Sequence, residues 1–179
     1  MRAIPGLQVV RPADAHEAVE AWKLALLYED GPTALVFTRQ GLPVLPPPPE
    51  GAVARGGYVL RDGSDPQVVL VGTGSEVSLC MQAADRLAAE GIRARVVSMP
   101  CVERFLDQAQ DVRDGVLPAG VPVVSIEAGI TLGWERIVGT KGIALGIDSF
   151  GASAPAADLA EHFGFTADRV VEAARRVLG

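Results

Sequence analysis

One stretch decides the fold class of this chain, namely Gln67-Val68-Val69-Leu70-Val71-Gly72-Thr73-Gly74-Ser75-Glu76-Val77. Its apolar run is short and continuous, which is typical of a strand buried on both faces. The two glycines that follow turn the chain, and the pattern from 75 to 90 predicts a helix. A strand followed directly by a helix is the repeating unit of a parallel α/β sheet.

The same rhythm of strands and helices continues toward the C-terminus. Apolar, β-rich runs predict strands at 94–98, 121–126 and 143–147, and an edge strand at 57–60 that leads into the turn Asp62-Gly63. A closing helix is predicted at 166–178, with short helices at 102–108, 133–138 and 155–162. We therefore expect three layers, α/β/α, built on a mostly parallel five-stranded sheet.

A partial βαβ unit precedes this sheet. Residues 7–10 and 33–38 predict two short strands, and residues 14–28 predict the helix between them. Asp14 is placed to cap this helix, with Glu17 three residues later as a capping-box partner. Four apolar side chains share one helix face: Ala15, Val19, Trp22 and Leu26. Because one βαβ unit cannot cover both faces of a sheet, we expect exposed apolar surface, with self-association or disorder.

A proline-rich segment separates the two parts. It contains Pro43 and four consecutive prolines from Pro46, which can neither continue a helix nor donate to a strand ladder. The predicted division is the end of a larger doubly wound domain at 1–42, a stiff linker at 43–56 and a complete α/β domain at 57–179.

Composition limits the kinds of function. With 179 residues, 49% of them hydrophobic, the chain can bury a core. A net charge of -6, with basic residues interspersed among acids, argues against nucleic acid as a partner. No apolar run approaches the roughly 20 residues of a membrane span and no signal peptide is evident, so we expect a cytoplasmic protein. Cys80 and Cys101 suit two reduced, buried thiols rather than a disulfide framework or a zinc site.

Short segments of distinctive sequence run through almost the whole chain. They are Val10-Arg11-Pro12-Ala13-Asp14, Gly31-Pro32-Thr33-Ala34-Leu35, Thr38-Arg39-Gln40, Gly72-Thr73-Gly74-Ser75-Glu76-Val77, Val96-Val97-Ser98-Met99-Pro100, Glu127-Ala128-Gly129 and Gly146-Ile147-Asp148-Ser149-Phe150-Gly151-Ala152-Ser153-Ala154-Pro155. In this order and at these spacings, they resemble the C-terminal portion of a transketolase. The resemblance implies that residues 1–42 end the pyrimidine-binding domain and that residues 57–179 form the transketolase C-terminal domain.

Arg39 is the strongest candidate for a binding residue. It follows a predicted strand, and ligands of open α/β sheets gather outside the carboxyl ends of strands. On its own, such an arginine is more often a solvated residue or half of a structural ion pair. In transketolases the arginine of this Ser/Thr-Arg-Gln segment binds the terminal phosphate of the sugar substrate, so the resemblance implies that role for Arg39.

The loop Gly72-Thr73-Gly74-Ser75 is a second candidate, for an anion. It lies where a strand meets a helix N-terminus, whose free N–H groups and dipole favour negative charge. The loop lacks the third glycine of a dinucleotide fingerprint and the lysine of a P-loop. A tight turn with Thr73 or Ser75 capping the helix is therefore the favoured interpretation.

The remaining candidates favour structural interpretations. Ser153 lacks the second glycine of a nucleophile elbow, because Pro155 stands there, and a triad with Asp158 and His162 would be compressed into ten residues. Glu127 follows a strand and can pair locally as easily as titrate. Three more residues are predicted to pack or lie on the surface: His16, His162 and Trp134, the last as a core or interface residue.

The resemblance also implies a cofactor that this chain is not equipped to hold. Transketolases bind thiamine diphosphate through Mg (or Ca), using a Gly-Asp-Gly motif and a downstream asparagine. The sequence contains no Gly-Asp-Gly and no asparagine, and neither histidine corresponds to the family's active-site histidines. We therefore expect no catalytic, cofactor-binding or metal-binding residue in this chain.

The sequence leads to two alternative hypotheses for the function of this chain. The first is the C-terminal part of a transketolase, which moves a two-carbon ketol unit between sugar phosphates in the pentose phosphate pathway. This part would be inactive alone, would need an upstream part that carries the cofactor site, and would form a homodimer. The alternative is a non-catalytic regulatory module, whose C-terminal domain serves for dimerisation or for binding an anion at residues 72–75.

Overall fold

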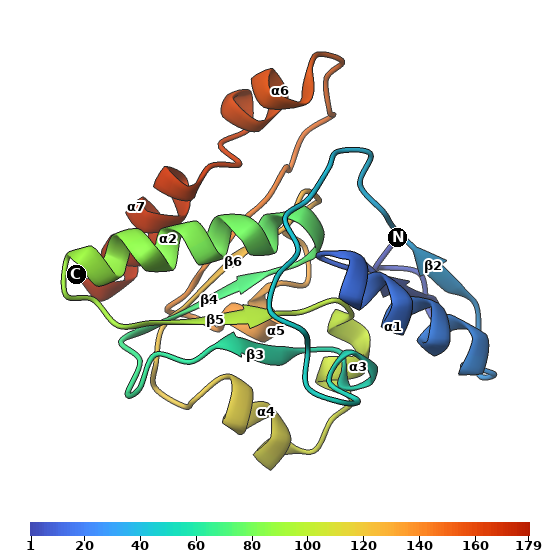
Figure 1. Cartoon of the computed structure of the whole chain (residues 1–179). Helices are drawn as coiled ribbons and strands as arrows, with labels where there is room; N and C mark the ends of the chain where they lie inside the picture. The colour runs from blue at the N-terminus through green and yellow to red at the C-terminus, as the bar shows by residue number, and fades with distance from the viewer.

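The larger of two sheets forms the centre of the structure. The computed structural model describes residues 1–179 (Figure 1). This sheet has the strand order β3-β5-β4-β6-β7. The strands are β3 Tyr58–Arg61, β4 Val68–Gly72, β5 Ala94–Ser98, β6 Val123–Ile126 and β7 Ile143–Leu145. Only the edge strand β3 is antiparallel, which confirms the predicted mostly parallel five-stranded sheet.

The strand β4 lies at the middle of this sheet because its residues are apolar on both sides. It pairs in parallel with β5 on one side and β6 on the other, and all five of its residues are buried. Alternate side chains enter opposite cores: Val68 and Leu70 belong to one, Val69 and Val71 to the other. The unbroken valine-rich run therefore places β4 between two helical layers.

Helices cover both faces of the sheet, as Figure 1 shows. One layer consists of α2 Val77–Ala89 and α7 Ala167–Leu178, which pack over β4, β5 and β6. The other consists of α3 Val102–Leu106, α4 Gln110–Val116 and α5 Glu135–Val138. The sequence did not predict α4, because its apolar residues form no continuous stripe and none of them is buried. None of the helices is long and apolar enough to cross a membrane.

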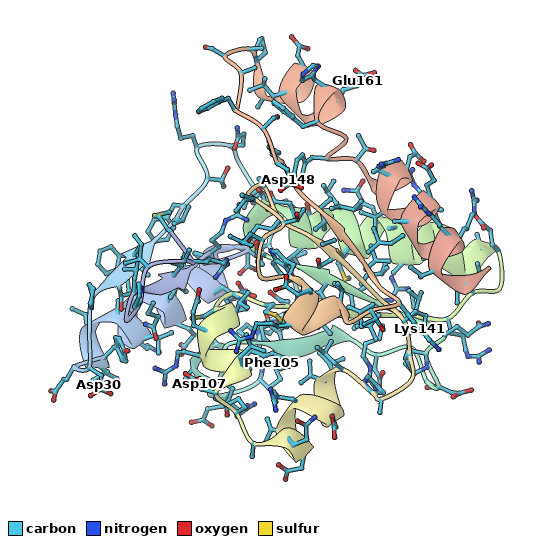
Figure 2. All side chains as sticks on the ribbon, turned by 180° about the vertical axis from the view of Figure 1, so that it is seen from behind. Asp30, Phe105, Asp107, Lys141, Asp148 and Glu161 are labelled. Atoms are coloured by element: carbon cyan, nitrogen blue, oxygen red, sulfur yellow. The ribbon has the colours of Figure 1, made fainter.

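One helix stands away from the body of the protein. The helix α6 Ala156–His162 projects at the top of Figure 1, and none of its residues is buried. The segment leading to it leaves the body at Asp148, whose carboxylate accepts hydrogen bonds from the backbone N–H (2.8 Å) and hydroxyl of Thr131. Figure 2 labels Asp148 at the base of this segment and Glu161 on the projecting helix. Phe150, between them, is 99% exposed.

The N-terminal βαβ unit forms a separate, two-stranded parallel sheet. Its elements are β1 Gln8–Val10, α1 Ala15–Leu27 and β2 Thr33–Leu35, as predicted, with β2 shorter than expected. A 3-10 turn, η1 Val53–Arg55, interrupts the segment expected to be a linker. The helix α1 packs against η1 and Cys101 of the larger domain.

The apolar face predicted on α1 is not the face that the chain buries. Trp22 is 54% exposed and Leu26 is 78% exposed, and the Trp22 ring stacks on the Phe37 ring with 6.3 Å between centroids. The buried residues are instead Glu17, Ala21 and Leu24. This face is buried because it packs against Cys101 and η1. The exposed apolar surface expected on this unit is therefore confirmed.

Glu17 joins the two parts of the chain. Asp14 caps α1 as predicted, but the Glu17 carboxylate accepts from Ala13 N (2.7 Å) rather than from the cap residue itself. Its other oxygen accepts from the Tyr58 hydroxyl (2.8 Å) and from the Ser98 hydroxyl. Burial raises the pKa of Glu17, although hydrogen bonds from Ser98, Ala13 and Tyr58 oppose the change. One buried carboxylate thus links α1 with β3 and β5.

We predict that Glu17→Ala lowers the free energy of unfolding by about 1 to 3 kcal/mol, because buried donors lose their acceptor. Urea denaturation followed by circular dichroism measures this change. The matched control is Glu20→Ala on the same helix, where the side chain pairs only with exposed Lys23. Equal stability changes for the two variants would contradict the role given to Glu17.

Candidate functional site

The polar residues that cluster in this structure follow three strands, one from the small sheet and two from the large one. Arg11 follows β1, Thr73 follows β4 and Glu127 follows β6. In each case a polar residue directly follows an apolar strand. The fold brings the ends of these three strands together, although they belong to two sheets. The carboxyl ends of strands are where α/β proteins hold ligands.

Arg11 lies at the centre of this cluster. Its Nη1 atom donates to Thr73 Oγ1 (2.6 Å), Glu76 Oε2 (2.8 Å) and Glu127 Oε1 (3.4 Å). Its backbone carbonyl accepts from Gly74 N at 3.0 Å. Gly74 has φ +56, and a Cβ atom there would stand 3.3 Å from the Arg11 guanidinium, so a glycine suits both the turn and the close approach.

The Glu127 carboxylate accepts hydrogen bonds from several side chains in addition to Arg11. Arg2 Nη2 donates to its Oε1 atom at 2.6 Å, Trp134 Nε1 donates to Oε2 at 3.0 Å, and the Thr73 hydroxyl donates to Oε1 at 3.1 Å. Burial alone would raise the pKa of Glu127, which is 5% exposed, but the bond to Arg2 and the charges of Arg2 and Arg11 lower it overall. The carboxylate is therefore held ionised.

A cavity of about 460 Å³ opens beside this cluster. Arg2, Glu103 and Glu127 line its polar side, and Arg2 also donates to Glu103 at 3.1 Å. Its apolar walls are Val102, Leu106, Ile130, Leu132 and Trp134. Figure 2 labels Phe105 on the helix α3, which forms one wall, and Asp107 directly after that helix; Phe105 is buried in the core and Asp107 is exposed on the cavity rim. The charges at its buried end, Arg2, Arg11, Glu103 and Glu127, are paired with one another.

The side chains of the loop predicted to bind an anion already form hydrogen bonds within the chain. Gly72, Thr73 and Gly74 are buried and Ser75 is half-buried. The expected helix cap is wrong: Thr73 makes no capping hydrogen bond, because its hydroxyl bonds to Arg11 and Glu127 instead. The Ser75 hydroxyl donates to the Glu76 carboxylate at 2.5 Å. Anion binding at this loop stays a prediction.

Arg39 lies outside the buried cluster. It is exposed, beyond the end of β2, and its side chain makes no hydrogen bond or ion pair within the chain. Its neighbours Thr38 and Gln40 bond to each other through their side chains. The guanidinium is thus free to meet an external anion, and its role stays a prediction.

The other candidates take structural positions. Ser153 is exposed in the loop before α6, and His16 is exposed on α1. The His162 ring packs edge-on against the Phe163 ring, with 4.7 Å between centroids. Trp134 is a core residue. Cys80 and Cys101 are free and buried, as predicted, and burial raises the pKa of both thiols, that of Cys101 to about 12.

Sequence reasoning assigned no role to Arg2 or Arg11. A signal for Arg11 was present, because it directly follows an apolar strand, which is the same pattern that drew attention to Arg39. No local signal marks Arg2, whose partner Glu127 lies 125 residues away.

The residues present do not fit a metal-bridged diphosphate. No three His, Cys, Asp or Glu side chains are grouped to hold a metal ion. The acids of the cluster are instead committed to Arg2 and Arg11, whereas a metal that bridges a diphosphate needs free oxygen ligands around it.

Comparison with known families identifies the chain. The family described as the transketolase-like TK C-terminal domain matches residues 56–166, and the transketolase pyrimidine-binding domain matches residues 1–44. The chain belongs to the transketolase family. Its transketolase relatives include the chromosomal enzyme of Cupriavidus necator, 54% identical over 99% of this chain, and that of Geobacillus stearothermophilus, 48% identical over 100% of it. The chain spans 27% and 28% of these two relatives.

Solved transketolase structures share this fold. A transketolase variant from Pichia stipitis superimposes with a TM-score of 0.92 at 37% identity, over 99% of this chain and 26% of that one. Transketolase from Leishmania mexicana gives 0.89 at 45% identity, with the same two coverages. A split-gene transketolase, described as an inactive β4 tetramer, gives 0.79 at 26% identity, over 99% of this chain and 60% of that one.

We predict that Glu127→Gln flattens the acid dependence of stability. Since the pKa of Glu127 is lowered from 4.5, its contribution is present above that pH and is lost as the pH falls through the folded-state pKa. Urea denaturation at a series of pH values should show a steeper decline below about pH 4.5 for the unaltered chain than for Glu127→Gln. Exposed Glu135→Gln serves as the control and should keep the original slope. Parallel curves for all three proteins would contradict this account of Glu127.

Proposed function

We propose that this chain is the C-terminal part of a transketolase and acts in the cytoplasm within a homodimeric enzyme. The complete enzyme would transfer a two-carbon ketol unit between sugar phosphates. The observation that carries the proposal is the match of two consecutive transketolase domains along one chain, at 1–44 and 56–166. The proposed division is residues 1–42, a linker at 43–56 and the C-terminal domain at 57–179.

The cofactor chemistry belongs to the upstream part in this proposal. Thiamine diphosphate with Mg (or Ca) would supply the carbanion chemistry of ketol transfer when bound there. The residues of this chain contribute binding and support, because its buried acids are paired with arginines and its sequence lacks Gly-Asp-Gly and asparagine. The isolated chain is therefore inactive.

The exposed apolar face of the βαβ unit is the proposed contact with that upstream part. Val19, Trp22, Leu26 and Phe37 are each about half or more exposed and lie on one small unit. The sheet β1-β2 has only two strands, whereas a stable doubly wound domain needs more strands and helices on both faces. Burying this surface against the upstream strands and helices would complete the domain.

The same surface supports a second possibility, assembly without catalysis. The split-gene transketolase relative is described as an inactive β4 tetramer and contains a region equivalent to 99% of this chain. Copies of this chain could associate through the Trp22 and Phe37 surface when no upstream part is present. In that case the chain acts as an assembly module rather than as part of an enzyme.

Arg39 is the proposed contact with the sugar phosphate. It is exposed and unpaired in the loop that follows β2, four residues after Leu35, and a guanidinium can hold a phosphate through two parallel hydrogen bonds. The buried loop at residues 72–75 is a weaker candidate for an anion, because Arg11, Glu76 and Glu127 already surround it.

We predict that the chain shows ketol transfer only when combined with an upstream transketolase part. The assay mixes both polypeptides with thiamine diphosphate, magnesium, a ketose phosphate and an aldose phosphate, and measures the new sugar phosphates. Activity from the chain alone would overturn the proposal. The upstream polypeptide should be one that is active with its own C-terminal part. If it binds this chain stably but shows no activity with it, the result would favour the assembly module.

We predict that Arg39→Ala in the combined enzyme weakens binding of phosphorylated substrates by about 1 to 3 kcal/mol, as expected for a lost charged hydrogen bond. Steady-state kinetics should show a raised KM for an aldose phosphate and an unchanged KM for a short aldehyde without phosphate. Arg176→Ala is the control, since Arg176 is also exposed but lies on α7. An unchanged KM for the phosphate would remove Arg39 from the site.

A further inference from the structure

The loop that carries Arg39 is fixed at both ends by one short segment. At its start, Val36 N donates to the Val10 carbonyl at 2.9 Å. At its end, Leu45 N donates to Asp14 Oδ2, also at 2.9 Å. Residues 10 and 14 thus hold the two ends of a loop that spans residues 36–45.

Asp14 uses its two oxygens for different tasks. Its Oδ1 atom accepts from Glu17 N at 3.0 Å and caps α1, while Oδ2 holds Leu45. Asp14 is only 9% exposed and Leu45 is half-buried, so the bond between them is partly shielded from competing water. One residue therefore connects the start of a helix to the end of a loop 31 positions later.

The composition of the loop makes this bond hard to replace. In the stretch from Pro43 to Pro49, only Val44 and Leu45 retain a backbone N–H, because the other residues are prolines. The side chains within the loop bond only locally, between Thr38 and Gln40. Without Leu45 N–Asp14 Oδ2, the part of the loop beyond Val36 would lose its hydrogen bond to the folded body.

The segment that holds the loop is itself anchored in the larger domain. Arg11 N donates to the Pro100 carbonyl at 2.8 Å, and the Arg11 side chain enters the buried cluster at Thr73 and Glu127. At the other end of the segment, Glu17 bonds to Tyr58 and Ser98. Asp14 lies between these two anchors, so its position is set by the C-terminal domain.

We propose that Asp14 is a positioning residue, whose second carboxylate oxygen holds the Arg39 loop in place to receive the phosphate of a sugar substrate. This inference rests on the proposed role of Arg39. In this inference the C-terminal domain contributes indirectly to substrate binding, because it fixes the position of Asp14 and Asp14 holds the Arg39 loop.

The test uses Asp14→Asn. Asparagine caps a helix as well as aspartate does, so α1 keeps its Oδ1 acceptor. The amide NH₂ that replaces Oδ2 cannot accept from Leu45 N, and the loop end is released. Asp14→Ser is a second variant that keeps a capping oxygen and loses the tether, and Asp14→Ala, which loses both, reports the cost of losing the cap.

Two measurements apply to these variants. In the 179-residue chain, amide hydrogen exchange in peptides covering 36–45 should accelerate by about tenfold or more in Asp14→Asn, with α1 peptides unchanged. In the enzyme combined with its upstream part, KM for an aldose phosphate should rise about fivefold with kcat nearly constant, and KM for an unphosphorylated aldehyde should stay the same.

The outcomes separate this inference from the proposed function. If Arg39→Ala raises the phosphate KM but Asp14→Asn and Asp14→Ser leave it unchanged, Asp14 does not position the loop and the inference is wrong. Unchanged exchange in residues 36–45 would also overturn it. If Arg39→Ala itself has no effect on KM, both the proposed role of Arg39 and the inference built on it fail.

Discussion

The structure depends on the buried contact of Arg11 with Glu76 and Glu127. No strand pairing joins the two sheets, so the βαβ unit is held on the larger domain by two backbone hydrogen bonds at Arg11 and by buried side chains. Removing charged groups from water is costly unless they are paired and fully hydrogen-bonded, and such pairs tolerate little displacement. The Arg11 guanidinium between Thr73 and the two glutamates, together with Arg2 on Glu127, therefore sets how the two parts of the chain lie against each other.

This arrangement leaves the βαβ unit bound on one side and open on the other. Glu17 and Ala21 of α1 face the larger domain, whereas Trp22, Leu26 and Phe37 face outward. Apolar surface of this kind is normally covered in a finished domain. The match to a transketolase pyrimidine-binding domain at residues 1–44 is consistent with that view, since this segment holds only two strands. Both proposed functions place a protein partner on the same surface.

The contacts of the first helix join the larger domain to the loop that carries Arg39. Arg11, Asp14 and Glu17 lie within seven residues and together contact Ser98 of β5, Leu45 and the residues that follow β4 and β6. A guanidinium binds phosphate more tightly when its position is fixed in advance, because ordering a mobile loop on binding has an entropic cost. If Arg39 has the role proposed above, the larger domain would act as a rigid support for that contact.

The sequence by itself determined the elements and their class. Apolar runs such as Val68–Val71, the glycines at 72 and 74 and the Asp14 cap act over a few residues, so the parallel sheet, the βαβ unit and the separating prolines could be predicted. The helix α4 was missed because its packing does not follow a regular apolar stripe. Only the tertiary structure decided which face of α1 is buried, that the Thr73 hydroxyl bonds to Arg11 instead of capping a helix, and that Asp14 also holds Leu45. The physical reason is distance along the chain: the partners of Arg11 lie 62 to 116 residues away, and no local pattern encodes which distant groups will meet.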